Sequence, residues 1–176
     1  MQGLRRHIRG GRAGLALGLA ALMTLTSCAR HTEDAARALV SQWFELGETL
    51  YFESKSKCTA AVYRVRTGDV KSRVPLFASV DAVSANGQQD RAFALTVPDT
   101  SADALFIQLM NADRPTGVAI QAAGIEARNC MTEKARNTFY AALTVQPSVL
   151  VFSPGDGAFA VLDPLRHLVV LTSGDM

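Results

Sequence analysis

The stretch SVLVFSPGDGAFAVLDPLRHLVVLTS, residues 148–173, decides the fold class of this chain. It contains three short apolar runs, SVLVF, AFAVLDP and HLVVLTS, which are separated by the turn-forming sequences PGDG and Pro-Leu-Arg. This pattern predicts an antiparallel meander of three strands at the C-terminal end. Because the runs are rich in valine and leucine, we expect the meander to form the centre of a sheet.

Alternating side chains predict three further strands upstream of the meander. Two of them, TLYFES at residues 49–54 and CTAAVYRV at residues 58–65, are expected to pair through a tight turn at KSK. The third is RAFALTV at residues 91–97, where Phe93, Leu95 and Val97 alternate with other side chains.

Helical spacing predicts helices between these strands. The first begins after Thr32 and ends at Gly47, and the last extends from about Thr132 to Leu143. Another follows the capping-box sequence TSAD at residues 100–103. The segment VPLFASVDAVSANG at residues 74–87 contains the hairpin signal Asn-Gly, but its apolar spacing favours a helix over residues that follow the proline.

Strands and helices that do not strictly alternate indicate the α+β class rather than a parallel sheet. We therefore expect a single domain at residues 32–176, with one antiparallel sheet of five or six strands whose one face is buried under the helices. The apolar segment at residues 117–124 is assigned to no element.

The N-terminal end has the pattern of a secretory signal. The first 12 residues contain four arginines and no acidic residue, and residues 13–25 are apolar and uncharged. As a helix, these 13 residues would rise roughly 20 Å, which is less than the ~30 Å thickness of a bilayer core. A cleaved signal is therefore favoured over a transmembrane helix.

The apolar run ends in Leu25-Thr26-Ser27-Cys28, which resembles the lipobox of bacterial lipoprotein precursors. The resemblance implies that residues 1–27 are removed and that both the thiol and the new amino group of Cys28 are acylated. Each buried methylene contributes about 0.8 kcal/mol, so several chains would attach the protein permanently to a lipid bilayer. Ala29 follows where relatives retained in the inner membrane have aspartate, which implies the periplasmic face of the outer membrane.

Residues 28–31 then form a short lipidated tether. At ~3.3 Å per residue, the three residues after Cys28 reach about 10 Å, so the domain is expected close to the bilayer. Removal of four arginines from 18 basic residues leaves 14 against 16 acidic ones, a formal charge of about −2. These charges are scattered, so we expect no nucleic acid partner.

Two further cysteines, Cys58 and Cys130, remain after processing. An even pair in an exported chain predicts a structural disulfide. The alternatives are two unrelated free thiols or a reactive pair, but the sequence has no CxxC spacing.

Few residues of the mature chain indicate chemistry. The only histidines are His31, beside the tether, and His167, at the start of a predicted strand. The sequence has no GxSxG and no phosphate-binding loop, and we expect no catalytic residue, no metal site and no cofactor.

An aromatic cluster of Trp43, Phe44, Tyr51 and Phe52 belongs either to the core or to an interaction surface. The sequence therefore favours a non-enzymatic binding or scaffolding module of the cell envelope, anchored through Cys28 and with a possible envelope protein as partner. The alternative is a lipid-anchored hydrolase of an envelope substrate that uses His167 as its base.

Overall fold

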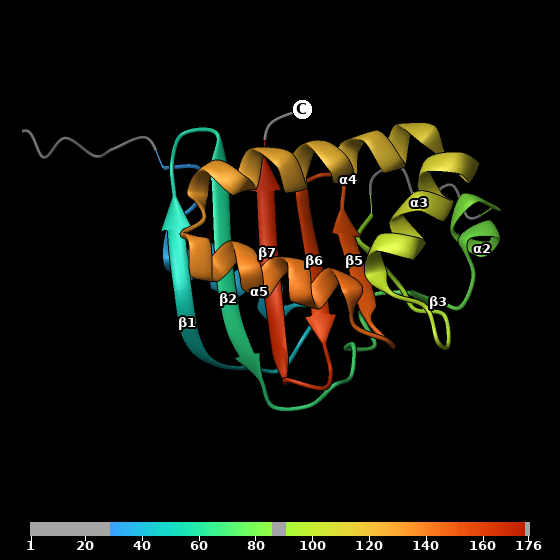
Figure 1. Ribbon diagram of the computed structural model, residues 1–176, viewed down its shortest axis with the longest axis horizontal. Helices are drawn as coiled ribbons and strands as arrows, with labels where there is room; N and C mark the ends of the chain where they lie inside the picture. Colours follow the sequence, from blue (N-terminus) through green and yellow to red (C-terminus); the bar gives the residue numbers. More distant parts are fainter. Residues whose placement is uncertain (1–28, 86–90, 175–176) are drawn as a thin grey trace, which may run out of the picture.

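The computed structural model describes residues 29–85 and 91–174 (Figure 1). The predicted signal at residues 1–27, the lipobox residue Cys28 and the Asn86-Gly87 pair lie outside the described residues. None of the described helices is long and apolar enough to cross a bilayer.

Seven strands form one sheet in the order β1-β2-β7-β6-β5-β4-β3. All neighbouring strands are antiparallel except β3 and β4, which are parallel. The strands are β1 (Leu46–Ser54), β2 (Cys58–Val65), β3 (Leu76–Phe77), β4 (Phe93–Leu95), β5 (Val149–Ser153), β6 (Ala158–Asp163) and β7 (Leu168–Gly174). The α+β class and the C-terminal meander β5-β6-β7 are confirmed, with β7 and β6 in the middle of the sheet.

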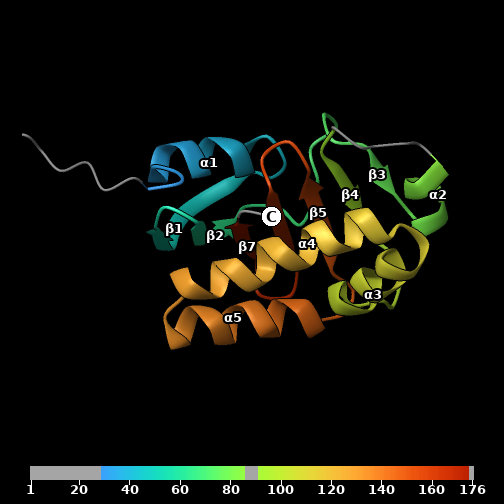
Figure 2. The same cartoon turned by 90° about the horizontal axis from the view of Figure 1, so that it is seen from above.

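Five α-helices lie among the described residues and cover both faces of the sheet (Figure 2). They are α1 (Glu33–Ser41), α2 (Val80–Ala85), α3 (Ala102–Ala112), α4 (Arg114–Ala127) and α5 (Glu133–Thr144), and a 3-10 turn, η1 (Arg128–Cys130), follows α4. Helices α3, α4 and α5 lie on one face, and α1 lies on the opposite face.

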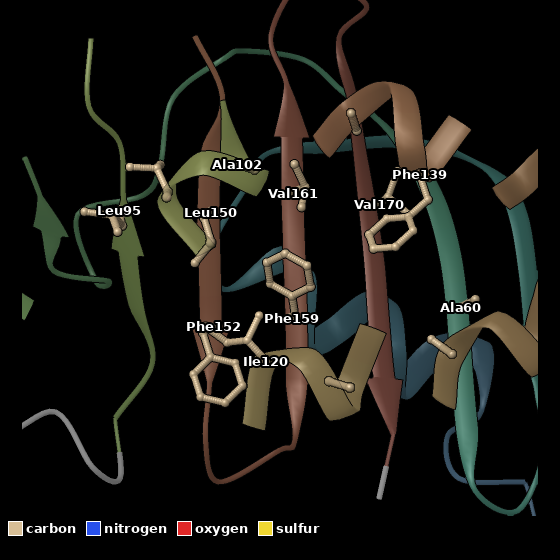
Figure 3. Packing of buried hydrophobic residues seen from close by; sticks show 14 of the residues in the cluster. Ala60, Leu95, Ala102, Ile120, Phe139, Leu150, Phe152, Phe159, Val161 and Val170 are labelled. Atoms are coloured by element: carbon tan, nitrogen blue, oxygen red, sulfur yellow. The ribbon is translucent and has the colours of Figure 1, made fainter. Parts of the chain in front are cut away.

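The expectation that only one face is buried is therefore incomplete. All six residues of β6 are buried, and its alternate side chains enter two different clusters. Phe159 and Val161 pack in the cluster under α3, α4 and α5 (Figure 3). Ala160 and Leu162 belong to the other cluster, on the α1 side. The continuous apolar run AFAVL is the pattern of a strand that is covered on both faces.

Aromatic rings fill the cluster between the sheet and α5. The rings of Phe139 on α5 and Phe159 on β6 meet edge to face, with centroids 6.3 Å apart. Phe93 and Phe152 make a similar contact at 6.1 Å between β4 and β5. Such pairs stabilise a core beyond the area that they bury.

Two helix starts agree with the prediction in detail. The hydroxyl of Thr32 accepts a hydrogen bond from the backbone N–H of Ala35, and that of Thr132 accepts one from Ala135. At α3 the capping residue is Ser101, whose hydroxyl bonds instead to the carboxylate of Asp103.

The sequence prediction is wrong at the end of the first helix and at β3, a strand that it assigned to a helix. Helix α1 ends at Ser41, and Gly47 lies inside β1. Residues 76–77 form β3 rather than a helix, because Phe77 packs on Phe93 and the backbone pairs with β4. Helix α2 begins only at Val80, and segment 117–124 belongs to α4.

Candidate functional site

The predicted disulfide joins β2 to η1. The sulfur atoms of Cys58 and Cys130 are bonded at 2.04 Å, and both residues are buried. This bond holds the connection between α4 and α5 against the turn between β1 and β2. In the same place, the Nζ atom of Lys55 donates a hydrogen bond of 2.6 Å to the carbonyl oxygen of Asn129.

The aromatic cluster does not form one surface. Trp43 and Phe44 are 1% and 0% exposed and belong to the core on the α1 side. Tyr51 and Phe52 are half-buried neighbours on β1, and they pack on opposite faces of the sheet. The hydroxyl of Tyr51 donates to the carbonyl oxygen of Cys130 at 2.7 Å, so this side chain joins β1 to η1.

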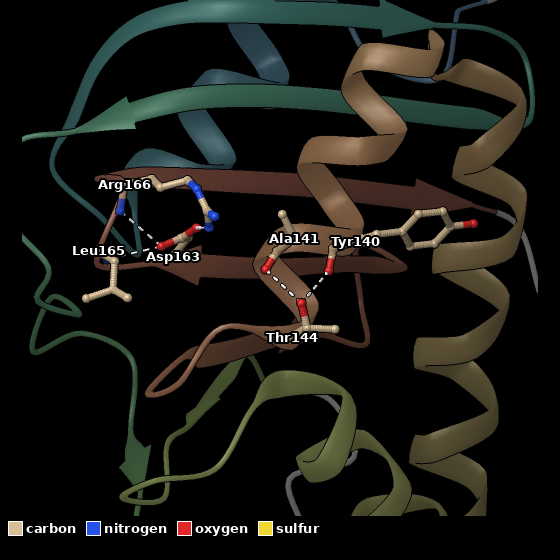
Figure 4. Close-up of polar contacts among 6 residues, drawn as sticks. All are labelled: Tyr140, Ala141, Thr144, Asp163, Leu165 and Arg166. Atoms are coloured by element: carbon tan, nitrogen blue, oxygen red, sulfur yellow. Dashed lines mark hydrogen bonds and ion pairs between the residues drawn. The ribbon is translucent and has the colours of Figure 1, made fainter.

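His167 lies in the exposed turn between β6 and β7. The buried carboxylate of Asp163 organises this turn by accepting hydrogen bonds of 3.0 Å from the backbone of Leu165 and Arg166 (Figure 4). The same carboxylate pairs with the guanidinium of Arg166 at 2.6 Å. Among the residues that the structure describes, no hydroxyl or carboxylate bonds to the imidazole of His167.

A group of linked side-chain hydrogen bonds surrounds the first described residues of the chain. We name it the tether junction and define it as Arg30, His31, Ser54, Thr59 and Ser173. Ser54 is opposite Thr59 in the pairing of β1 with β2, and Thr59 is opposite Ser173 in the pairing of β2 with β7. Three hydroxyl side chains therefore form a row across one end of the sheet, on the face that α1 covers.

Both residues of the junction that precede α1 bond to this row. The backbone N–H of His31 donates to the hydroxyl of Ser54 at 3.1 Å, and its Nδ1 atom lies 3.0 Å from the hydroxyl oxygen of Thr59. The hydroxyls of Ser54 and Thr59 are 2.8 Å apart.

Arg30 completes the junction on the β7 side. Its Nε atom donates to the hydroxyl of Ser173 at 2.7 Å, and its Nη2 atom donates to the carbonyl oxygen of Asp156 at 3.3 Å. Its backbone N–H donates to the carbonyl oxygen of Lys55 at 2.9 Å. Arg30 thus bonds to three neighbouring segments: the turn between β1 and β2, the turn between β5 and β6, and the end of β7.

Burial in the tether junction favours the uncharged form of the His31 imidazole. Partial burial lowers the pKa of His31 below its usual value, the positive charge of Arg30 lowers it further, and Asp156 opposes this shift. A neutral imidazole is therefore favoured at neutral pH. Thr59 has no exposed surface, so its hydroxyl is a bonding partner in the interior and not a nucleophile that a substrate reaches.

Sequence reasoning missed this site, since its residues lie far apart in the sequence and carry no motif. A second feature is a cavity of about 200 Å³ between α3, α4 and α5, whose walls include Phe106, Gly124 and Phe139. Ile125 and Tyr140 line it and are 52% and 42% exposed, and Tyr140 points from α5 toward α4 (Figure 4). This helical face therefore presents apolar side chains to the surroundings.

Comparison with known proteins identifies no relative. The sequence matches no protein-family model, and neither a curated protein nor a solved structure is similar to it. The function of this chain is therefore argued from its own residues.

Proposed function

We propose that the protein is a bacterial lipoprotein anchored through acylated Cys28 at the periplasmic face of the outer membrane. Its domain acts as a non-enzymatic binding or scaffolding module of the cell envelope. The observation that carries this proposal is the tether junction, because the residues that directly follow Cys28 in the sequence are bonded to the folded domain. An anchor at Cys28 would therefore hold the domain itself and not a long linker.

The length of chain between the anchor and the junction supports a close attachment. Only Ala29 separates Cys28 from Arg30. Two steps of 3.8 Å between neighbouring Cα atoms span at most about 7.6 Å. The Cα atom of Cys28 would thus lie at most about 7.6 Å from that of Arg30, and a lipid on Cys28 would place the domain directly at the bilayer surface.

The disulfide supports the same compartment. Disulfides persist in oxidising spaces such as the bacterial periplasm and are rare in the cytosol. The buried bond between Cys58 and Cys130 is therefore consistent with a chain that folds after export. No observation favours the alternative of a hydrolase, since His167 is exposed in a turn and lacks a described hydroxyl or carboxylate partner.

The anchor is tested by mass spectrometry of the N-terminal peptide of the mature protein from its native host. We expect a peptide that begins at Cys28, with a diacylglyceryl group on the sulfur and an acyl group on the amine. The Cys28→Ser variant should lose membrane association. An unmodified Cys28, or a mature protein that fractionates as freely soluble, contradicts the proposal.

The binding role is tested by cross-linking in intact cells. A photoreactive residue is placed at Ile125 or Tyr140 on the helical face, and at Leu165 as a control that is 68% exposed in the turn between β6 and β7. We expect one discrete product with an envelope protein from the helical positions and none from Leu165. Products from neither surface, together with no co-purifying envelope protein, contradict the binding role.

A further inference from the structure

We infer that the sheet end with the tether junction lies against lipid headgroups, and that Lys55, Lys57 and Arg128 contact their phosphate groups. The inference rests on the proposed acylation of Cys28. It adds an orientation: the turn between β1 and β2 faces the bilayer, and the turn between β6 and β7 points away from it.

The contacts of the tether junction place the turn at residues 55–57, which contains Lys55 and Lys57, beside the residues that follow the anchor. The N–H of Arg30 is bonded to the carbonyl oxygen of Lys55, and the N–H of His31 is bonded to the hydroxyl of Ser54. The turn at residues 55–57 is thus adjacent to the residues that follow the anchor (Figure 1). The bond from Lys55 to Asn129 brings η1, and with it Arg128, to the same turn.

The charges of this end are available to an external anion. Lys55, Lys57 and Arg128 are exposed. Neither Lys57 nor Arg128 has an ion pair or a side-chain hydrogen bond within the part of the chain that the structure describes. Carboxylates also lie near this end. Glu33 and Asp34 begin α1 just after the tether junction, and Glu126 lies against Gly174, the partner of Cys58 in the pairing of β2 with β7. The carboxylate of Asp156 already accepts a hydrogen bond of 2.6 Å from Ser153.

Acyl chains hold a protein at a bilayer but do not select which side of the domain faces it. A basic side chain near an anionic lipid surface contributes a factor of about five in binding, so three of them favour one orientation by roughly a hundredfold. Because the junction allows little freedom between anchor and domain, these contacts form without ordering a flexible linker.

Amine labelling of the acylated full-length mature protein tests the inference. The protein is reconstituted in vesicles of phosphatidylcholine with or without phosphatidylglycerol, and the labelling rates of its lysines are compared with those in detergent. Lys71 is a matched control, since its Nζ donates to the carbonyl oxygen of Ser41 at 2.7 Å just as Lys55 donates to Asn129. Lys71 follows the opposite end of β2, away from the junction.

We expect Lys55 and Lys57 to be labelled at least fivefold more slowly in vesicles with phosphatidylglycerol, and Lys71 to be unchanged. The double variant Lys57→Gln/Arg128→Gln should lose the part of the Lys55 protection that depends on phosphatidylglycerol, whereas Lys134→Gln should keep it. Labelling of Lys55 and Lys57 at the detergent rate, or equal protection of Lys71, overturns the inference. The N-terminal peptide in the same digest reports acylation, so an unmodified Cys28 is recognised separately as a failure of the proposed function.

Discussion

The Nδ1 atom of His31 lies 3.0 Å from the hydroxyl of Thr59, a side chain with no exposed surface. The segment before α1 is thus bonded to the interior of the sheet and not only laid upon it. The stability of the segment before α1 therefore depends on Thr59 of β2, which lies 28 positions later in the chain.

Replacement of Thr59 by valine should loosen the tether junction. The variant keeps the β-branched shape but removes the hydroxyl that contacts His31 and Ser54, so we expect a loss of about 1 kcal/mol in the free energy of unfolding. Hydrogen exchange should accelerate at the amides of Arg30 and His31. Thr172→Val is the matched control, since Thr172 is equally buried but bonds to the carbonyl oxygen of Phe159. Unchanged exchange at Arg30 and His31 in Thr59→Val would falsify a bonded junction.

The protein should lose stability in mildly acidic solution through His31. Its pKa in the folded protein is lower than the usual value near 6.5, so between these values the unfolded chain binds more protons than the folded one. The free energy of unfolding should therefore fall as pH decreases through 6.5 toward the folded pKa, and should level off above 6.5. Urea titrations between pH 7.5 and 5 measure this slope.

A His31→Gln variant should show a flatter profile in the same window, because it removes the titrating group. His167→Gln leaves the tether junction intact and is the matched histidine control. Identical slopes for the wild type and His31→Gln would show that another group controls the acid response.

Loss of the disulfide should be the largest single effect. The bond closes a loop of 72 residues, for which the chain-entropy account gives about 4 kcal/mol of stabilisation. The double variant Cys58→Ala/Cys130→Ala, and the wild type in strong reductant, should both show this decrease in urea unfolding. Cys28→Ser should leave the unfolding of the domain unchanged. A double variant as stable as the wild type would exclude a structural role for the bond.

Two glycines of α4 should respond to alanine in opposite directions. A Cβ atom at Gly117 would lie 2.6 Å from the Cα atom of Met110, so α3 and α4 must separate at a cost of about 1–3 kcal/mol. At Gly124 the nearest atom is Cζ of Phe139 at 3.9 Å, an ordinary contact. Because glycine weakens a helix interior, Gly124→Ala should stabilise the protein by about 0.5–1 kcal/mol. Thermal unfolding of both variants measures the contrast, and a neutral Gly117→Ala would contradict the close contact of α3 with α4.

Regular elements could be predicted from the sequence where their pattern is local. The strand β2 has the bounds Cys58–Val65 that alternation and the flanking turn indicate, and the meander follows from apolar runs between turns. The strand β3 could not be found in this way. Leu76 and Phe77 share a helical spacing with Val80 and Val83, but pairing with β4 decides their structure, and that partner is distant in sequence.

The tether junction could not be predicted from local sequence patterns either, because it depends on the order of the strands. Its hydroxyl residues stand near the ends of three strands, where serine and threonine are common and carry no distinctive spacing. Only the order β1-β2-β7 brings Ser54, Thr59 and Ser173 into one row. By contrast, the cysteine pair could be predicted, because cysteine is rare and its pairing follows from the compartment.

The position of β7 between β2 and β6 has a consequence for folding kinetics. The hairpin of β1 and β2 is local in sequence and can form early, but the other edge of β2 has no partner until β7 pairs with it. Arg30 in turn waits for Ser173, which is 143 positions away. Contacts between residues so far apart in the sequence form slowly, so the segment before α1 can bond to the sheet only after β7 has paired with β2.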